Sequence, residues 1–223
     1  MVVHPLKIFI LNPNATHRMT EEMVTAAQAA VGLSAQVQGL TNSTGPASIQ
    51  GPDDAAACLT GLFGLFDQAQ AQGADAVVVG CFDDTGLGQL RARNSLPVIG
   101  LGEAGCIAGS LAASRFSVVT TLEVSVPVIA ENVRAMGLWD RCAGIHASGV
   151  AVLDLNAGPE SIHRVQRAVD LTLASDPDLS IVLGCGGMTC IAPQIMTPRA
   201  AQIIDPVVAA AHMCLAAHSL RQN

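Results

Sequence analysis

The chain has 223 residues, of which 50% are hydrophobic and 13% charged, and its formal net charge is −7. This composition excludes an intrinsically disordered chain, and an acidic protein without basic runs is a poor candidate for binding nucleic acid or anionic membranes. The single lysine, Lys7, argues against a pyridoxal-phosphate enzyme and, because it lies in no GK[ST] motif, against a P-loop nucleotide-binding protein.

The first half of the chain alternates short apolar runs with helical patterns. A buried strand is predicted over residues 7–11, and the spacing of Met19, Met23 and Ala26 predicts a helix that begins near Thr16. Further along, the sequence predicts a strand over 35–39, a loop over 42–52, a helix over 53–72, and strands over 76–80 and 97–99, the last followed by a helix from Glu103.

The second half repeats this pattern. Strands are predicted over 116–120, 181–184 and 202–204, with helices over 124–136 and after the last strand. The offset between matching strands is nearly constant, which indicates an internal duplication or at least two similar halves. Apolar strands separated by helices predict parallel sheets that are covered on both faces. We therefore expect an α/β fold of two similar subdomains related by a pseudo-two-fold axis.

Ligands of such sheets bind beyond the carboxyl ends of the strands, near helix N-termini. The residues at these ends are Asn12, Asn14, Cys81, Thr120, Thr121 and Cys185. If the two halves face each other, the two cysteines lie on opposite sides of one cleft.

These two cysteines occupy similar local sequences, VVVGCFDDTG and IVLGCGGMTC. A helix N-terminus favours an anion, so we expect the pKa of both thiols to be lowered from about 8.5. One thiolate and one thiol on opposite faces of a carbon suit two-base racemisation. The other five cysteines are expected to be free core residues, since there is no C-x-x-C pair. No spacing favours a metal site.

Two neighbouring features have alternative interpretations. GLGEAG, residues 100–105, matches the dinucleotide fingerprint, but we interpret it as a closely packed strand-to-helix turn. Asp83 and Asp84 either cap a helix or lie in a solvated loop, or they orient the Cys81 thiol or accept a hydrogen bond from a substrate N–H. Asp84 is included among the candidate substrate contacts.

Six segments together resemble the hydantoin racemase family of the aspartate/glutamate racemase superfamily. They are LNPNATHRMT, PASIQGPDDA, VVVGCFDDTGL, LPVIGLGEA, RFSVVTTLEVSVPVI and IVLGCGGM, within residues 7–213. The resemblance implies racemisation without a cofactor or metal through Cys81 and Cys185, in a cleft between two subdomains. We expect the first subdomain to comprise residues 1–97 and 205–223, and the second residues 98–204.

Matching motif to motif, the resemblance implies substrate contacts at Asn12, Ser48, Thr120, Thr121, Gly186 and Gly187. The sequence departs from the family at Pro52, where relatives often carry an aromatic residue, and at Gly186, where alanine is frequent. Arginine and lysine are absent from both cysteine motifs, so a neutral or weakly acidic cyclic ureide fits better than a dicarboxylate.

The expected function is racemisation of 5-substituted hydantoins, with allantoin as a close variant. Aspartate or glutamate racemases, lyases and cis–trans isomerases of the superfamily remain alternatives, as do a dinucleotide-dependent oxidoreductase and a ureide-binding protein without activity. No apolar stretch reaches the about 18 residues of a membrane-spanning helix, and the N-terminus is not typical of a signal peptide. We expect a cytoplasmic homo-oligomer that binds a small molecule.

Overall fold

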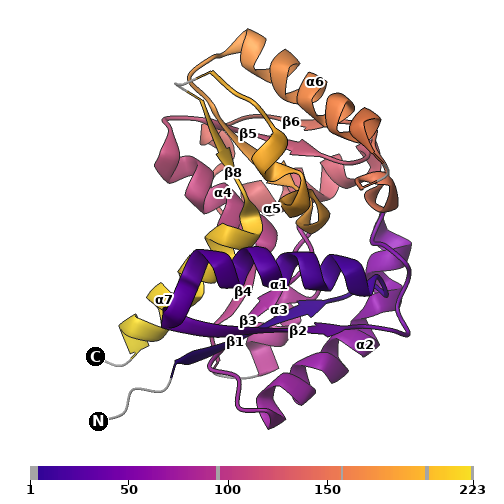
Figure 1. The fold of residues 1–223 in the computed structure, drawn as a ribbon, viewed down its shortest axis with the longest axis vertical. Helices are drawn as coiled ribbons and strands as arrows, with labels where there is room; N and C mark the ends of the chain where they lie inside the picture. The colour runs from indigo at the N-terminus through magenta and orange to yellow at the C-terminus, as the bar shows by residue number, and fades with distance from the viewer. Residues whose placement is uncertain (1–4, 94–95, 157, 199–200, 222–223) are drawn as a thin grey trace.

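The first half of the chain folds around a parallel sheet. The computed structural model describes residues 5–93, 96–156, 158–198 and 201–221 (Figure 1). The sheet has the order β2-β1-β3-β4 and consists of β1 (Leu6–Asn12), β2 (Ala35–Thr41), β3 (Ala76–Val79) and β4 (Val98–Gly100). Its helices are α1 (His17–Val31), α2 (Pro52–Ala71) and the short α3 (Leu87–Arg93).

A second parallel sheet repeats this order as β6-β5-β7-β8. Its strands are β5 (Phe116–Thr120), β6 (Cys142–Ala147), β7 (Ser180–Gly184) and β8 (Gln202–Ile204). The helices α4 (Leu101–Ala112), α5 (Val126–Ala135) and α6 (Pro159–Ser175) accompany it, and α7 (Pro206–Arg221) ends the fold. The prediction of an α/β fold with two similar subdomains is thus confirmed.

Three elements have no counterpart in the sequence prediction, namely α3, β6 and α6. Strand β6 lies at the edge of its sheet and is only partly buried, so it lacks the apolar run that marks the central strands. Helix α6 does carry a signal, because Val165, Val169 and Leu173 are buried at helical spacing.

Strand β4 belongs to a different sheet than the expected limit between the subdomains implies. Strand β4 pairs with β3 in the first sheet, whereas the expected limit at residue 97 assigns it to the second subdomain. The chain therefore crosses over after β4, not before it. Helix α7 packs against α1 and β3 of the first subdomain and also against α4, and in Figure 1 it runs beside α1.

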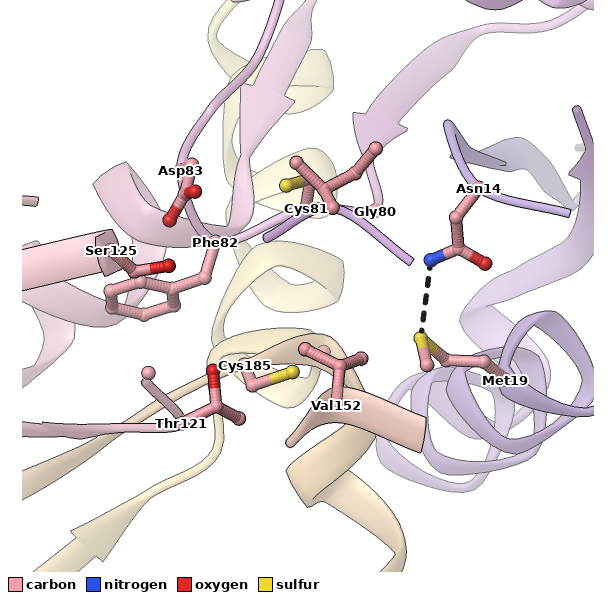
Figure 2. A pocket seen from close by; sticks show the side chains of 13 residues that line it. Asn14, Met19, Gly80, Cys81, Phe82, Asp83, Thr121, Ser125, Val152 and Cys185 are labelled. Carbon is pink, nitrogen blue, oxygen red and sulfur yellow. Dashed lines mark hydrogen bonds between the residues drawn. The ribbon is translucent and has the colours of Figure 1, made fainter. Parts of the chain in front are cut away.

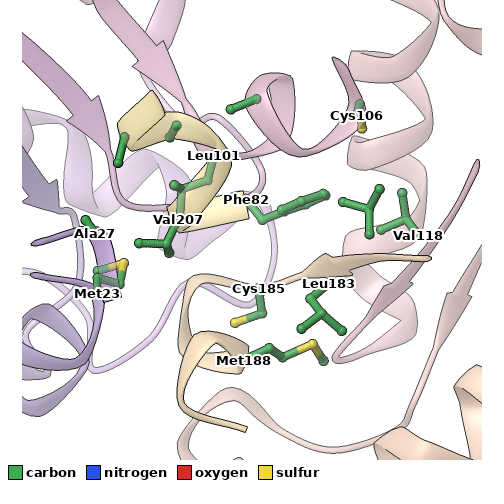
Figure 3. Close-up of a cluster of buried hydrophobic side chains, with 14 of the residues drawn as sticks. Met23, Ala27, Phe82, Leu101, Cys106, Val118, Leu183, Cys185, Met188 and Val207 are labelled. Atoms are coloured by element: carbon green, nitrogen blue, oxygen red, sulfur yellow. The ribbon is translucent and has the colours of Figure 1, made fainter. Parts of the chain in front are cut away.

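One hydrophobic cluster includes residues of both sheets. Figure 3 shows Met23 of α1 and Leu101 of α4 on one side of Phe82, and Leu183 and Met188 on the other. Burying a side chain of this size contributes about 1.5–3 kcal/mol. The loop that carries Phe82 is therefore fixed between the two subdomains.

None of the described helices is both long and apolar enough to span a bilayer.

Candidate active site

A small cavity lies where the carboxyl ends of the two sheets face each other. Cys81 follows β3 after Gly80, and Cys185 directly follows β7. The cavity measures about 30 Å³, enough for about two water molecules. It is lined by Asn14, Met19, Ile49, Gly80, Cys81, Phe82, Asp83, Thr121, Ser125, Val152, Gly184, Cys185 and Gly186. Figure 2 shows Cys81 and Cys185 on opposite walls.

Close backbone packing holds both cysteines in place. A side chain at Gly80 would approach the Leu11 carbonyl oxygen to 3.0 Å, and one at Gly186 would approach the Met23 sulfur to 2.9 Å. Glycine beside each cysteine therefore lets the strand ends pack against α1 and β1. The Cys81 Sγ lies 3.8 Å from the Thr85 Oγ1, and Cys185 precedes a 3₁₀ turn over Gly186–Cys190.

The environment of the two thiols raises their pKa, contrary to the expected lowering. The pKa of Cys81 lies well above its ordinary value and that of Cys185 is raised to about 12, in both cases mainly by burial and in part by the negative charge of Asp83. Backbone N–H groups of Gly187 and Met188 donate toward Cys185 and act in the opposite direction. The turn after each strand thus supplies the expected donors, but desolvation outweighs them.

Of the expected substrate contacts, Thr121 and Gly186 line the cavity, and Asn12, Ser48, Thr120 and Gly187 do not. Asn12 is fully buried, and its Nδ2 donates to the Asn14 Oδ1 at 3.1 Å and to the Thr20 Oγ1 at 2.9 Å. The Thr120 hydroxyl donates to the Gly184 carbonyl at 2.9 Å. These two residues thus hold the strand ends that carry the wall.

Asp84, the remaining expected contact, serves the fold instead. Its carboxylate oxygens accept hydrogen bonds from the backbone N–H groups of Gly102 at 2.9 Å and Glu103 at 2.7 Å. A side chain at Gly102 would lie 2.2 Å from the Phe82 carbonyl oxygen. The glycines of GLGEAG thus allow α4 to begin against the Cys81 loop, and Asp84 occupies the anion-binding end of α4. This arrangement supports the interpretation as a packed turn.

Several lining residues were not among the sequence candidates for substrate contacts: Met19, Ile49, Phe82, Asp83, Ser125 and Val152. From the sequence, Asp83 is interpreted together with Asp84, and the nearby Cys81 is the local signal that Asp83 belongs to the site. Val152 lies in a segment without strong periodicity, so only the fold brings it here. Within the described ranges, no group of three histidine, cysteine or acidic side chains could hold a metal ion.

Two matched α/β subdomains with a cysteine at each facing strand end define a two-lobed protein with a thiol pair in its cleft. The Asp/Glu/hydantoin racemase family model matches residues 8–214, and the chain belongs to this family of isomerases. It is 34% identical to a hydantoin racemase of Rhizobium meliloti over 93% of this chain and 87% of the relative. Identity to a hydantoin racemase of Paenarthrobacter aurescens is 32%, with 96% and 91% covered.

Solved structures show the same fold. The allantoin racemase from Klebsiella pneumoniae matches with a TM-score of 0.92 and 32% identity, over 97% of this chain and 89% of that chain. A glutamate racemase from Bacillus anthracis matches with a TM-score of 0.74 at 16% identity, over 98% and 83%. The second likeness concerns the fold alone.

Proposed function

We propose that the protein racemises 5-substituted hydantoins at C5 by two-base proton transfer between Cys81 and Cys185. The observation that carries the proposal is the position of the two thiols on opposite walls of one cavity. The relatives named hydantoin racemase support the substrate class, and the protein itself is a racemase of this superfamily.

In the proposed reaction the thiolate of one cysteine takes the C5 proton, and the thiol of the other delivers its proton to the opposite face. The product has the inverted configuration, and the two cysteines have exchanged protonation states. The carbanion delocalises into the adjacent carbonyl as an enolate. The Thr121 side chain lines the same cavity, and its hydroxyl can donate to the developing charge.

The small volume of the cavity implies a movement that admits substrate. Room for about two water molecules does not admit a hydantoin ring, so the walls of the cavity must move apart for substrate to enter. Once they close again, water is excluded and the electrostatic stabilisation of the enolate is stronger.

Proton NMR in D2O together with optical rotation tests this function. Single enantiomers of benzyl- and isobutylhydantoin should lose the C5 proton and their rotation well above the uncatalysed rate. Cys81→Ser and Cys185→Ser should each lower racemisation by about 100-fold or more. Cys142→Ser is the matched control, because Cys142 lies in β6 outside the cavity. Near-normal racemisation by both active-site variants would refute the two-base mechanism.

Allantoin is the second candidate substrate. The Klebsiella allantoin racemase superposes over nearly the whole chain, and allantoin is itself a hydantoin with a ureido group at C5. Aspartate and glutamate have less support, because no lysine, arginine or histidine is among the described residues that line the cavity. The same NMR assay with allantoin, L-aspartate and L-glutamate ranks these substrates.

A further inference from the structure

Asp83 lies on the cavity wall and is held by the second subdomain. Its carboxylate accepts a hydrogen bond from the Ser125 hydroxyl, and its backbone carbonyl accepts one from the Asn132 Nδ2 at 2.9 Å. Ser125 directly precedes α5 and Asn132 belongs to it. Figure 2 shows Asp83 beside Ser125 on the side of the cavity that also carries Phe82. The carboxylate is therefore fixed in position before any ligand arrives.

This carboxylate has no cationic partner among the described residues. The ion pairs found there join Arg18 to Glu22, Arg91 to Glu103 and Arg115 to Asp176. A partly desolvated charge without a partner is costly, and burial accordingly raises the pKa of Asp83 to about 6. A ligand group that donates an N–H to this carboxylate would supply the missing partner.

The position of Asp83 relative to the two thiols indicates which part of the ligand its carboxylate contacts. Asp83 lies within electrostatic range of both Cys81 and Cys185. In the proposed reaction the two thiols lie above and below C5. A side chain close to both thiols then lies beside C5, where the substituent is attached to the ring. The ring itself is common to all hydantoins, so discrimination between hydantoins falls on the substituent.

We propose that Asp83 is a specificity-determining residue that accepts a hydrogen bond from an N–H of the C5 substituent. The site then favours ureido and cationic substituents over apolar ones and rejects substituents that carry a carboxylate. This inference rests on the proposed hydantoin racemisation. It also explains how the cavity can discriminate against acidic substrates, because Asp83 would repel a second carboxylate.

Matched substrates and a charge-removing variant test the proposal. Racemisation is measured for aminobutyl-, butyl- and carboxyethylhydantoin and for allantoin, with wild type, Asp83→Asn and Asp178→Asn. Asp178→Asn removes the same charge from an exposed position outside the cavity lining, before the end of β7 opposite Cys185. Wild type should prefer aminobutyl- over carboxyethylhydantoin in kcat/KM. Asp83→Asn should reduce that ratio by about tenfold or more, and Asp178→Asn should preserve it.

Comparing substrates on one enzyme at one pH cancels any general effect of Asp83 on thiol reactivity. Circular dichroism checks the fold, and Asp83→Ser serves as a second variant that also removes the charge. An unchanged ratio in a folded variant that still racemises would overturn the role of Asp83 and leave the function intact. Failure of wild type to racemise any of the four hydantoins would overturn both.

Discussion

At the scale of single residues, the proposed chemistry depends on the protonation of the two cysteines. Burial keeps both thiols neutral at pH 7, while backbone N–H groups at the turn after Cys185 favour the thiolate. The proposed two-base reaction uses one thiol and one thiolate, so in that reaction one of the two thiols must lose its proton before the first turnover. The raised pKa thus protects the thiols at rest and limits the reactive fraction.

Alkylation of Cys81 by iodoacetamide should therefore be slow at pH 7 and rise with pH. The thiolate is the nucleophile, so the rate should increase about tenfold per pH unit without a plateau up to pH about 9. Peptide mass spectrometry after quenching distinguishes Cys81 from the other cysteines. A plateau below pH 8 would show that the pKa of Cys81 is lowered, against the effect of burial.

At the scale of elements, the start of α4 supports the Cys81 loop. Asp84 has a φ of 51°, a left-handed conformation that aspartate tolerates better than most residues. In this conformation its carboxylate caps α4, while Phe82 packs into the core. The loop after β3 and the first turn of α4 therefore form one unit beside the cavity.

Gly102→Ala should disturb this unit. The new methyl group would lie 2.2 Å from the Phe82 carbonyl oxygen, so we expect a loss of about 1–3 kcal/mol in the free energy of unfolding together with reduced racemisation. Gly64→Ala is the matched control in α2, where nothing lies within 4 Å, and it should stabilise by about 0.5–1 kcal/mol. Urea unfolding measures both. Equal stability of the two variants would contradict the close approach.

At the scale of the whole molecule, hydrogen bonds join the two subdomains around the cavity. The Asn156 Nδ2 donates to the Glu22 Oε1 at 2.8 Å, and the Val152 N–H donates to the Gln50 Oε1 at 3.3 Å. Together with the bond from Asn132 to Asp83, these contacts favour the closed arrangement. If the subdomains separate when substrate enters, that motion must break some of these bonds.

Asn156→Ala should weaken closure. One such hydrogen bond contributes about 0.5–1.5 kcal/mol, so we expect KM to rise by about two- to tenfold with a smaller change in kcat. Gln166→Ala is the control, because Gln166 bonds to Asp170 and Met196 away from the cleft. Steady-state kinetics with one hydantoin measures KM and kcat of both variants and of wild type. A KM unaffected by Asn156→Ala would argue against this bond as a closing contact.

Alkaline conditions should destabilise the whole fold. Burial raises the pKa of Cys106, Cys185 and Cys214 above that of an unfolded thiol. A raised pKa in the folded state contributes stability below pH about 9 that is lost as the pH rises toward the folded values, by about 1.4 kcal/mol per pH unit for each thiol. With one lysine and no tyrosine in the sequence, few other side chains titrate there.

Urea midpoints at pH 7, 9 and 10 under reducing conditions measure this loss. Cys214→Ala should start from a lower stability at pH 7, because it leaves a cavity, but its stability should fall less steeply above pH 9. A midpoint that does not change between pH 7 and 10 would contradict the prediction.

The sequence by itself determined most strands of the two sheets and the place of the two cysteines. Buried parallel strands are continuous apolar runs, so VVVG and IVLG are visible locally, and the residue after each strand lies at the ligand-binding edge. Strand β6 and the limit of the first subdomain were missed, because an edge strand is not apolar throughout and because pairing of β4 with β3 is a long-range contact.

Only the tertiary structure decided the protonation of the thiols and the roles of the two aspartates. Desolvation depends on everything packed around a group, and no local motif encodes it. Asp83 and Asp84 are adjacent and chemically identical, yet one carboxylate lines the cavity and the other caps α4. The backbone conformation at Asp84 and the position of α4, brought there by distant parts of the chain, separate their roles.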